Sequence, residues 1–250
     1  MIDFTLNTYV TLVDSLLDAG YTSYTYERFL EMAPSGRGMI LRHDVDARNR
    51  HSLRFAEIQH KKQVTGTYYF RMTPGSFNEK IIRKISSMGH EIGYHYETMD
   101  TCKGNLDKAY SEFCKNLEAL RKIVTVRTIC MHGSPRSPFD NKEIWRKYHY
   151  RDLGIIGEPY FDIDFSKVAY LTDTGRMWNG SSVSVRDKVN SAFHFDFKST
   201  SQIIKHIHQL PDQVMFTFHP QRWTNNPLSW SRELVMQSIK NQVKHALVKR

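Results

Sequence analysis

The chain has 250 residues, of which 40% are hydrophobic and 24% are charged, and its formal net charge is +9. This apolar fraction excludes a disordered chain. The sequence contains no run of 18 apolar residues, so it predicts no membrane-spanning helix. Three cysteines without a CxxC pair exclude a disulfide scaffold and argue against a zinc site built from thiolates. The 12 histidines, in contrast, supply many side chains that bind metals or transfer protons near neutral pH.

The first 20 residues carry apolar side chains at helical spacing and end at Gly20, which predicts a helix. Asp3 stands where a signal peptide would be basic, so we interpret this segment as a docking helix and expect a cytoplasmic protein. We expect residues 1–37 to form a helical extension packed on a single catalytic domain that spans residues 1–250.

Patterns typical of strands and helices alternate along the rest of the chain. Strands are expected at 39–43, 66–71, 91–95, 126–132, 168–171, 193–197 and 214–219. Helices are expected near 53–58, 81–88, 106–120, 141–147 and 201–210, and in the basic C-terminal segment. This alternation predicts an α/β fold with parallel strands, and at this length it favours a barrel over two open sheets.

Polar side chains follow the ends of several expected strands, which is the functional face of a parallel barrel. Asp44 and Asp46 are two residues apart, so they point the same way from an extended chain. Two carboxylates at the mouth of a buried strand need a cation or a shared proton to compensate them. The alternative is that Asp46 caps the helix that follows.

Histidines end three more of the expected strands. In the run GHEIGYHYE, His95 and Glu97 share one face, whereas His90 faces the other side and is interpreted as a hydrogen-bonded core histidine. His132 precedes a turn, and taken alone it is an ordinary loop histidine. His219 ends the last strand, a position that suits acid–base chemistry, and its alternative role is to hold the turn at the following proline.

The order of these motifs resembles the NodB-type polysaccharide deacetylases, carbohydrate esterase family 4. The motifs are HDVD, GHEIGYHYE, MHGSPRSPFDN, LTDTGRMW and HPQRW, and they extend over most of the chain. They look like the divergent branch of this family that is associated with surface-polysaccharide biosynthesis, as in O-antigen or capsule assembly. The resemblance implies a distorted, incomplete (β/α) barrel that removes an N-acetyl, or sometimes an O-acetyl, group from a sugar.

The resemblance also implies roles for individual residues. Asp44 matches the catalytic base and His219 the catalytic acid, while Asp46 and His95 match two ligands of a divalent metal, expected to be zinc. The family's second metal-binding histidine corresponds here to Met99, whose thioether is a poor ligand for such an ion.

Another residue must therefore supply the third ligand, or metal binding is lost. His132 is the first candidate, and Glu97 and His90 follow it. If metal binding and hydrolysis are lost, the alternative is a catalytically inactive carbohydrate-binding protein on the same scaffold.

The residues expected to contact the substrate are Tyr94, Glu97, Arg136, Arg222 and Trp223. The aromatic rings would stack on sugars, and either arginine would orient the catalytic base. We expect an acetylated sugar linked to a nucleotide or a lipid, and the basic surface, including the last helix, would hold its diphosphate or approach an anionic membrane as a peripheral protein. No nucleic-acid-binding motif accompanies the positive charge, and phosphate release would instead indicate another metal-dependent barrel hydrolase.

Overall fold

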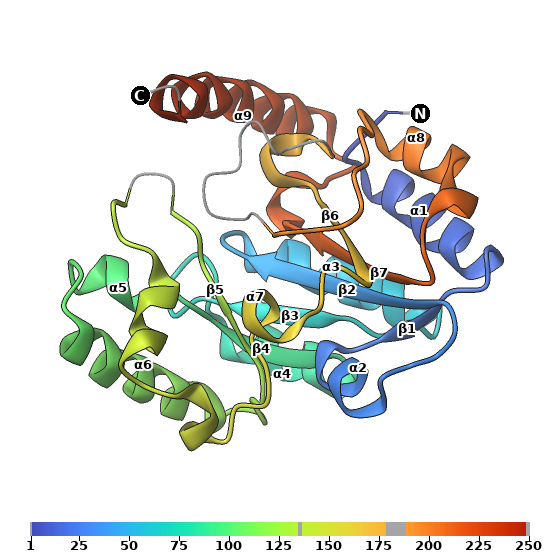
Figure 1. The fold of residues 1–250 in the computed structure, drawn as a ribbon. Helices are drawn as coiled ribbons and strands as arrows, with labels where there is room; N and C mark the ends of the chain where they lie inside the picture. Colours follow the sequence, from blue (N-terminus) through green and yellow to red (C-terminus); the bar gives the residue numbers. More distant parts are fainter. Residues whose placement is uncertain (1, 135–136, 179–188, 249–250) are drawn as a thin grey trace.

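A computed structural model describes residues 2–134, 137–178 and 189–248. Its centre is a curled sheet of seven parallel strands in the order β5-β4-β3-β2-β7-β6, with β1 paired to the first half of β2 (Figure 1). The strands are β1 (Thr22–Tyr24), β2 (Gly38–Val45), β3 (Thr67–Phe70), β4 (Glu91–Tyr96), β5 (Ile129–Met131), β6 (Val168–Thr172) and β7 (Gln213–Phe218). The curl leaves the sheet open between β5 and β6, which confirms the expected distorted, incomplete barrel.

Helices connect these strands and cover the sheet. The α-helices are α1 (Leu6–Asp18), α2 (Tyr26–Met32), α3 (Asn49–Lys61), α4 (Glu79–Ser87), α5 (Thr98–Thr101), α6 (Leu106–Arg121), α7 (Pro159–Asp162), α8 (Thr200–Lys205) and α9 (Pro227–Val248). Short 3-10 helices are η1 (Asn141–Arg146), η2 (Tyr150–Leu153), η3 (Thr174–Arg176), η5 (Ile207–Gln209) and η6 (Pro220–Arg222). Among the described residues, no helix has both the length and the apolar character needed to cross a membrane.

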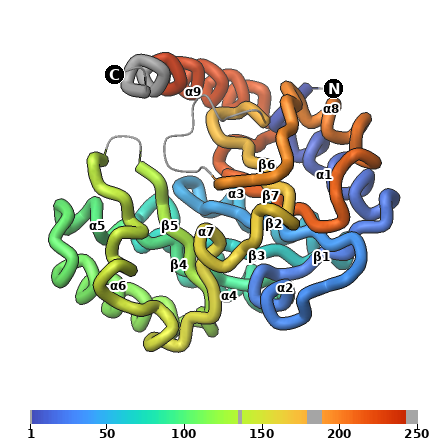
Figure 2. The backbone as a smooth tube through the Cα atoms, in the orientation of Figure 1, coloured from blue at the N-terminus to red at the C-terminus, as the bar shows by residue number. Residues whose placement is uncertain are grey.

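The N-terminal segment is less purely helical than the sequence suggested. Between α1 and α2 it contributes β1, which pairs in parallel with the beginning of β2. Helix α1 begins at an N-cap whose Thr5 side chain accepts a hydrogen bond from the backbone N–H of Thr8. Although α1 and α8 are far apart in the sequence, they lie side by side (Figure 2). Residues 1–37 therefore belong to the sheet as well as to the helical layer.

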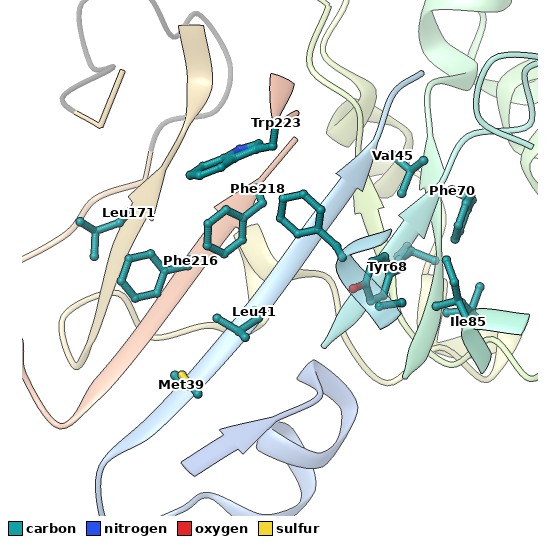
Figure 3. Packing of buried hydrophobic residues seen from close by; sticks show 14 of the residues in the cluster. Met39, Leu41, Val45, Tyr68, Phe70, Ile85, Leu171, Phe216, Phe218 and Trp223 are labelled. Atoms are coloured by element: carbon teal, nitrogen blue, oxygen red, sulfur yellow. The ribbon is translucent and has the colours of Figure 1, made fainter. Parts of the chain in front are cut away.

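Side chains of the central strands alternate between two faces of the sheet, as a period of two requires. Met39, Leu41 and Val45 of β2 pack with Phe216 and Phe218 of β7 in the large apolar core that the helices cover (Figure 3). We call this side the outer face. The opposite, inner face carries a smaller cluster of buried residues, which includes Ile40, Tyr69, Cys130 and Met215. The polar residues of the site described below come from the inner face and from the loops at its edge.

Two expected strands differ from the structure. The strand expected at 126–132 is shorter, since β5 covers only Ile129–Met131. The strand expected at 193–197 is not formed, although its alternating rings do face the core: Phe193 stacks near Phe195 at 6.5 Å, and Phe195 near Phe197 at 5.1 Å. The alternation is satisfied by side-chain packing, whereas a strand also needs a backbone partner, which local sequence does not specify.

Candidate active site

Arg42 and Asp44 lie on the inner face of β2 and form an ion pair within the strand. The guanidinium donates two parallel hydrogen bonds, from Nε to Oδ1 at 2.8 Å and from Nη2 to Oδ2 at 2.7 Å. Their side chains are only 1% and 5% exposed. Burial alone would lower the pKa of Arg42, but the Asp44 carboxylate outweighs it and holds this pKa well above its usual value. The pair therefore fixes the plane of the Asp44 carboxylate.

This pair corrects one expectation from the sequence. Arg222 was a candidate to orient Asp44, but its guanidinium bonds to Asp173 instead. Arg136, the other candidate, lies outside the described residues. The sequence did contain a signal for Arg42, because it precedes Asp44 by two residues and so shares its face.

Gly93, the second glycine of GHEIG, leaves space for the Tyr69 ring, which packs beneath the pair of Arg42 and Asp44. A Cβ atom on Gly93 would lie 2.3 Å from Cε1 of Tyr69, on the neighbouring strand. The Tyr69 ring occupies that space, and its centroid is 5.9 Å from the Arg42 guanidinium carbon. Glycine is thus required here by a close approach, and it lets an aromatic ring support Arg42 from the inside of the sheet.

Asp46, just past the end of β2, is the point on which two histidines converge. Its Oδ1 atom lies 3.5 Å from Nε2 of His95 and 3.6 Å from Nε2 of His132. The same Oδ1 is buried and has no hydrogen-bond partner among the described residues. Burial would raise the pKa of Asp46, but the nearby imidazoles of His132, His95 and His219 hold it well below its usual value.

His95 is oriented through its other ring nitrogen, and that of His132 faces a carboxylate. Nδ1 of His95 lies 2.9 Å from the carbonyl oxygen of Cys130, to which it must donate, so Nε2 is an acceptor in the neutral ring. Nδ1 of His132 lies 3.2 Å from Oε2 of Glu97, a distance that allows an ion pair, but it makes no hydrogen bond among the described residues. Arg71 in turn donates to both oxygens of Glu97, at 3.1 and 2.6 Å. This arrangement of carboxylate, imidazole and open Nε2 is typical of histidines that bind metals.

The charge around Glu97 matches this role. Burial would raise its pKa, but the nearby side chains of His132 and Arg71 lower it to about 2. Glu97 was expected either to contact substrate or to act as a ligand, and the structure places it behind His132, with both oxygens engaged by Arg71.

One carboxylate and two imidazole nitrogens are a suitable donor set for a divalent metal such as zinc. With zinc–ligand bonds of about 2.0–2.1 Å, tetrahedral geometry separates neighbouring ligand atoms by about 3.4 Å. The distances from Asp46 Oδ1 to the two Nε2 atoms, 3.5 and 3.6 Å, are close to that value. The histidine rings meet edge to face with their centroids 5.3 Å apart.

Among the described residues, two groups have donor atoms that all lie within 4.8 Å of one another, Asp44–His95–Cys130 and Glu97–Asp100–His132. Asp46, His95 and His132 are not such a group, because the two Nε2 atoms are farther from each other than each is from Asp46 Oδ1. We prefer the group around Asp46 because the carboxylates of Asp44 and Glu97 are already paired with arginines. The orphaned Oδ1 of Asp46 has no such partner among the described residues.

Met99 does not take part in this cluster. It lies in the short helix α5, is buried, and belongs to the large apolar core. His132 reaches the cluster from the end of β5 instead. His90, the last alternative ligand, is a core histidine as expected: its Nδ1 accepts from Gly66 N at 3.2 Å, and its Nε2 lies 3.0 Å from the Ala56 carbonyl oxygen. Burial lowers the pKa of His90 to about 4.

His219 lies on the other side of Asp46 and is held by a buried carboxylate. Its Nδ1 is 2.5 Å from Oδ1 of Asp173, and its backbone N–H donates to Oδ2 of the same residue at 2.9 Å. Its Nε2 lies 3.9 Å from Oδ2 of Asp46. Burial would raise the pKa of Asp173, but the charges of His219 and Arg222 outweigh it and hold this pKa below its usual value.

The sequence reading missed Asp173. It lies between β6 and η3 in the irregular part of the chain, and its connection to His219 appears only when β6 and β7 pair. The strands bring the two residues together, since the backbone N–H of Asp173 also donates to the carbonyl oxygen of Thr217 in β7.

Three residues expected to bind substrate are buried and have protein partners. Tyr94 points to the outer face, where it is buried and accepts a hydrogen bond from Asn116 at 2.9 Å. Trp223 is buried in the large core, and its indole N–H donates to Asp173 at 2.6 Å (Figure 3). Arg222 is buried and bonded to Asp173 at 2.9 Å. These side chains are enclosed by protein and bonded to protein partners, and their contact with a sugar stays a prediction.

Comparison with known proteins adds a likeness between structures. No protein-family model matches the sequence, and no curated protein matches it. The solved structures that resemble this chain are family 4 carbohydrate esterases. These structures do not confirm the resemblance to the branch associated with O-antigen assembly.

Three examples show the extent of the likeness. A family 4 pseudoenzyme from Bacillus anthracis is 16% identical with a TM-score of 0.47, and the alignment covers 84% of this chain and 62% of that one. An esterase from Streptococcus mutans is 13% identical with a TM-score of 0.47, covering 92% and 89%. An esterase from Streptomyces lividans, solved with acetate, is 15% identical with a TM-score of 0.43, covering 83% and 90%. Identities and TM-scores this low do not establish an activity for this chain.

Proposed function

We propose that this chain is a metal-dependent deacetylase that hydrolyses an N-acetyl or O-acetyl group on a sugar. The observation that carries the proposal is the buried, unpartnered Oδ1 of Asp46, which faces the Nε2 atoms of His95 and His132. These three residues would hold the metal. Zinc bound there would supply Lewis-acid polarisation of the acetyl carbonyl and activation of water.

Asp44 is the general base of the proposed reaction. Its Oδ2 lies 3.8 Å from Nε2 of His95, so the base borders the ligand cluster. Each Asp44 oxygen accepts one hydrogen bond from Arg42 and retains a further lone pair. A water beside the cluster can therefore give its proton to Asp44 as it attacks the acetyl carbon.

His219 is the general acid. Loss of a sugar amine requires a proton on the departing nitrogen, because an amide anion is a very poor leaving group. Asp173 fixes the ring of His219 through Nδ1, which leaves Nε2 directed toward Asp46. The Asp173 carboxylate also stabilises the protonated imidazole by its charge. Base and acid are thus each held by a buried partner of opposite charge.

The substrate is proposed from the sequence motifs as an acetylated sugar of surface-polysaccharide assembly, linked to a nucleotide or a lipid and processed in the cytoplasm. The net charge of +9 supports a substrate that carries a diphosphate. Glu97 is proposed to position His132 and not to bind this sugar, because Arg71 engages both of its oxygens.

The proposal is tested by acetate release from N-acetylated sugar nucleotides after reconstitution with zinc. Asp44→Asn keeps the size of the side chain but removes the base, so we expect release to fall by at least about 100-fold. Elemental analysis should still find metal in this variant. Asp164→Asn is the matched control, because the Asp164 side chain forms an ion pair with exposed Lys167 and accepts hydrogen bonds from its neighbour Ser166. Full activity of Asp44→Asn would contradict the assignment.

The second candidate is a sugar-binding protein without hydrolytic activity. The observation that favours it is Met99, which occupies the helix position of a metal-binding histidine and lies in the core. Calorimetry with the same sugars separates the two candidates. Binding without metal uptake or acetate release supports this alternative, whereas stoichiometric metal with acetate release supports the deacetylase.

A further inference from the structure

Helix α9 has its polar side turned toward the protein. Glu233 is buried and pairs with Arg48 at 3.4 Å, and Gln237 is buried one turn later. Asn241 donates to the carbonyl oxygen of Gly175 in η3 at 2.9 Å. These three residues follow at intervals of four, so they form one stripe along the helix. The protein body therefore anchors α9 through polar contacts.

The opposite side of α9 faces solvent and carries exposed apolar side chains. Leu228, Val235 and Ile239 are 83%, 58% and 53% exposed, and Met236 beside them is 46% exposed. At 100° per residue the first three fall within about 40° of one another, roughly opposite the polar stripe. We call these four residues the apolar stripe. The helix lies along an edge of the molecule (Figure 1). An ordinary surface helix turns its apolar side to the core, whereas α9 turns its polar stripe to the protein and the apolar stripe to solvent.

The net positive charge of α9 favours an anionic partner. Residues 227–250 contain five lysines and arginines against one glutamate. The glutamate, Glu233, is the side chain that is buried against the body. Arg232 and Lys240 are exposed. At 100° per residue Arg232 falls between Ile239 and Met236 around the helix, and Lys240 falls about 40° beyond Met236. Exposed apolar side chains with basic residues among and beside them match the surface of an anionic bilayer, where apolar side chains enter the acyl boundary and cations meet the headgroups.

A second copy of the chain fits less well. A stable protein interface buries about 800 Å² on each partner. The apolar stripe is one helix wide, and from residue 228 to residue 239 it is only about 17 Å long. Two such helices would also bring their positive charges together. We propose that α9 is a membrane-surface helix that docks this protein on anionic lipid bilayers through Leu228, Val235, Met236 and Ile239.

Docking by α9 would hold the candidate active site close to the bilayer. Helix α9 packs against η3, which begins directly after Asp173, the partner of His219. Arg176 of η3 also donates to the carbonyl oxygen of Trp230 at 3.1 Å. If the proposed function holds, this geometry favours a sugar carried on a membrane lipid, and the docking itself is independent of that function.

The test is co-sedimentation of the full chain with vesicles of phosphatidylcholine alone or of phosphatidylcholine with one quarter phosphatidylglycerol. We expect partitioning onto the anionic vesicles, with a decrease when salt is raised. Ile239→Glu places a charge in the apolar stripe and should weaken partitioning at least tenfold. Ser238→Glu adds the same charge to the same helix outside the stripe, and should weaken it much less.

Circular dichroism of both variants checks that α9 remains folded. No partitioning of the unchanged chain onto anionic vesicles overturns the proposal. Equal losses in Ile239→Glu and Ser238→Glu also overturn it, because charge alone would then explain binding. Light scattering measures the oligomeric state. A dimer that Ile239→Glu converts to a monomer would show that a second copy of the chain covers the apolar stripe, and would overturn the proposal. Since none of these measurements uses catalysis, failure of the deacetylase proposal leaves them interpretable.

Discussion

The carboxylate of Asp44 is held by the guanidinium of Arg42, two residues earlier in the same strand. A strand places such residues on one face, so the base and its partner are positioned by local geometry alone. The Tyr69 ring lies beneath the guanidinium, and Gly93 leaves space for that ring. The position of the base thus depends on two neighbouring strands and on an unbroken period of two along β2.

Replacing Arg42 with lysine should impair catalysis while the protein remains folded. Lysine retains the positive charge but cannot donate two parallel bonds, so the Asp44 carboxylate would rotate. We expect kcat for acetate release to fall by up to about 100-fold, with a smaller change in KM. Arg37→Lys is the control, since Arg37 forms a looser, more exposed pair with Asp212 at 3.7 Å. Equal effects of the two changes would rule out a specific positioning role.

Metal binding should depend on His132 and not on Met99. His132→Ala removes one of the two nitrogens that face Asp46, and we expect metal affinity to fall by at least about 100-fold. Met99→Leu conserves volume in the core, so it should cost less than about 1.5 kcal/mol and leave metal affinity unchanged. Titration with zinc against a chelating dye measures both. A larger loss in Met99→Leu would place the third ligand in α5.

The role of His219 can be separated from that of Asp44 by the leaving group. An amine needs a proton to depart, whereas 4-nitrophenolate does not. His219→Ala should slow hydrolysis of an acetamido sugar by about 10²–10⁴-fold and slow 4-nitrophenyl acetate far less. Asp44→Asn should slow both substrates, because each needs activated water. If His219→Ala affects the two substrates equally, His219 is not the acid.

The contribution of Glu91 to stability should fall as pH rises, against the opposite contributions of the buried histidines His43 and His90. This carboxyl is buried on the inner face of β4, where it accepts bonds from Thr67 and Glu27 at 2.8 and 2.9 Å. Burial raises its pKa from 4.5 to about 7. Between those values the Glu91 carboxyl binds more protons in the folded than in the unfolded state, so its contribution to the free energy of unfolding decreases with pH. That contribution decreases by about 3 kcal/mol and is constant above pH 7.

Glu91→Gln removes this titration and is the test of its origin. The glutamine oxygen can still accept from Thr67 and Glu27, while the hydroxyl of Thr128 can turn to accept from the amide nitrogen. Urea unfolding between pH 5 and pH 8 should show that, relative to the unchanged protein, the variant gains stability as pH rises from 5 to 7. An unchanged dependence of stability on pH would assign it to other groups, such as the buried Glu158, whose pKa is also raised to about 7.

The sequence determined most of the elements and the face on which the site lies. Alternation predicted that Asp44 and Asp46 share one face and that His95 and Glu97 share one face, because a period of two is a property of any extended chain. The positions of Asp44, His95 and His219 at strand ends predicted that they meet at one edge of the sheet.

The same period of two also implies that Tyr94, which precedes His95, faces the opposite way. It could also have identified Arg42, whose burial beside Asp44 follows from their spacing.

The tertiary structure decided which partners the polar residues have. Asp173 meets His219 only because β6 pairs with β7, and His132 takes its place beside Asp46 because β5 and β2 curl toward the same opening. The packing of Met99 and Trp223 into the core was likewise set by distant helices and rings. Short-range patterns depend on backbone geometry within a few residues, whereas contacts between distant segments depend on how complete elements pack, and only the folded chain specifies that.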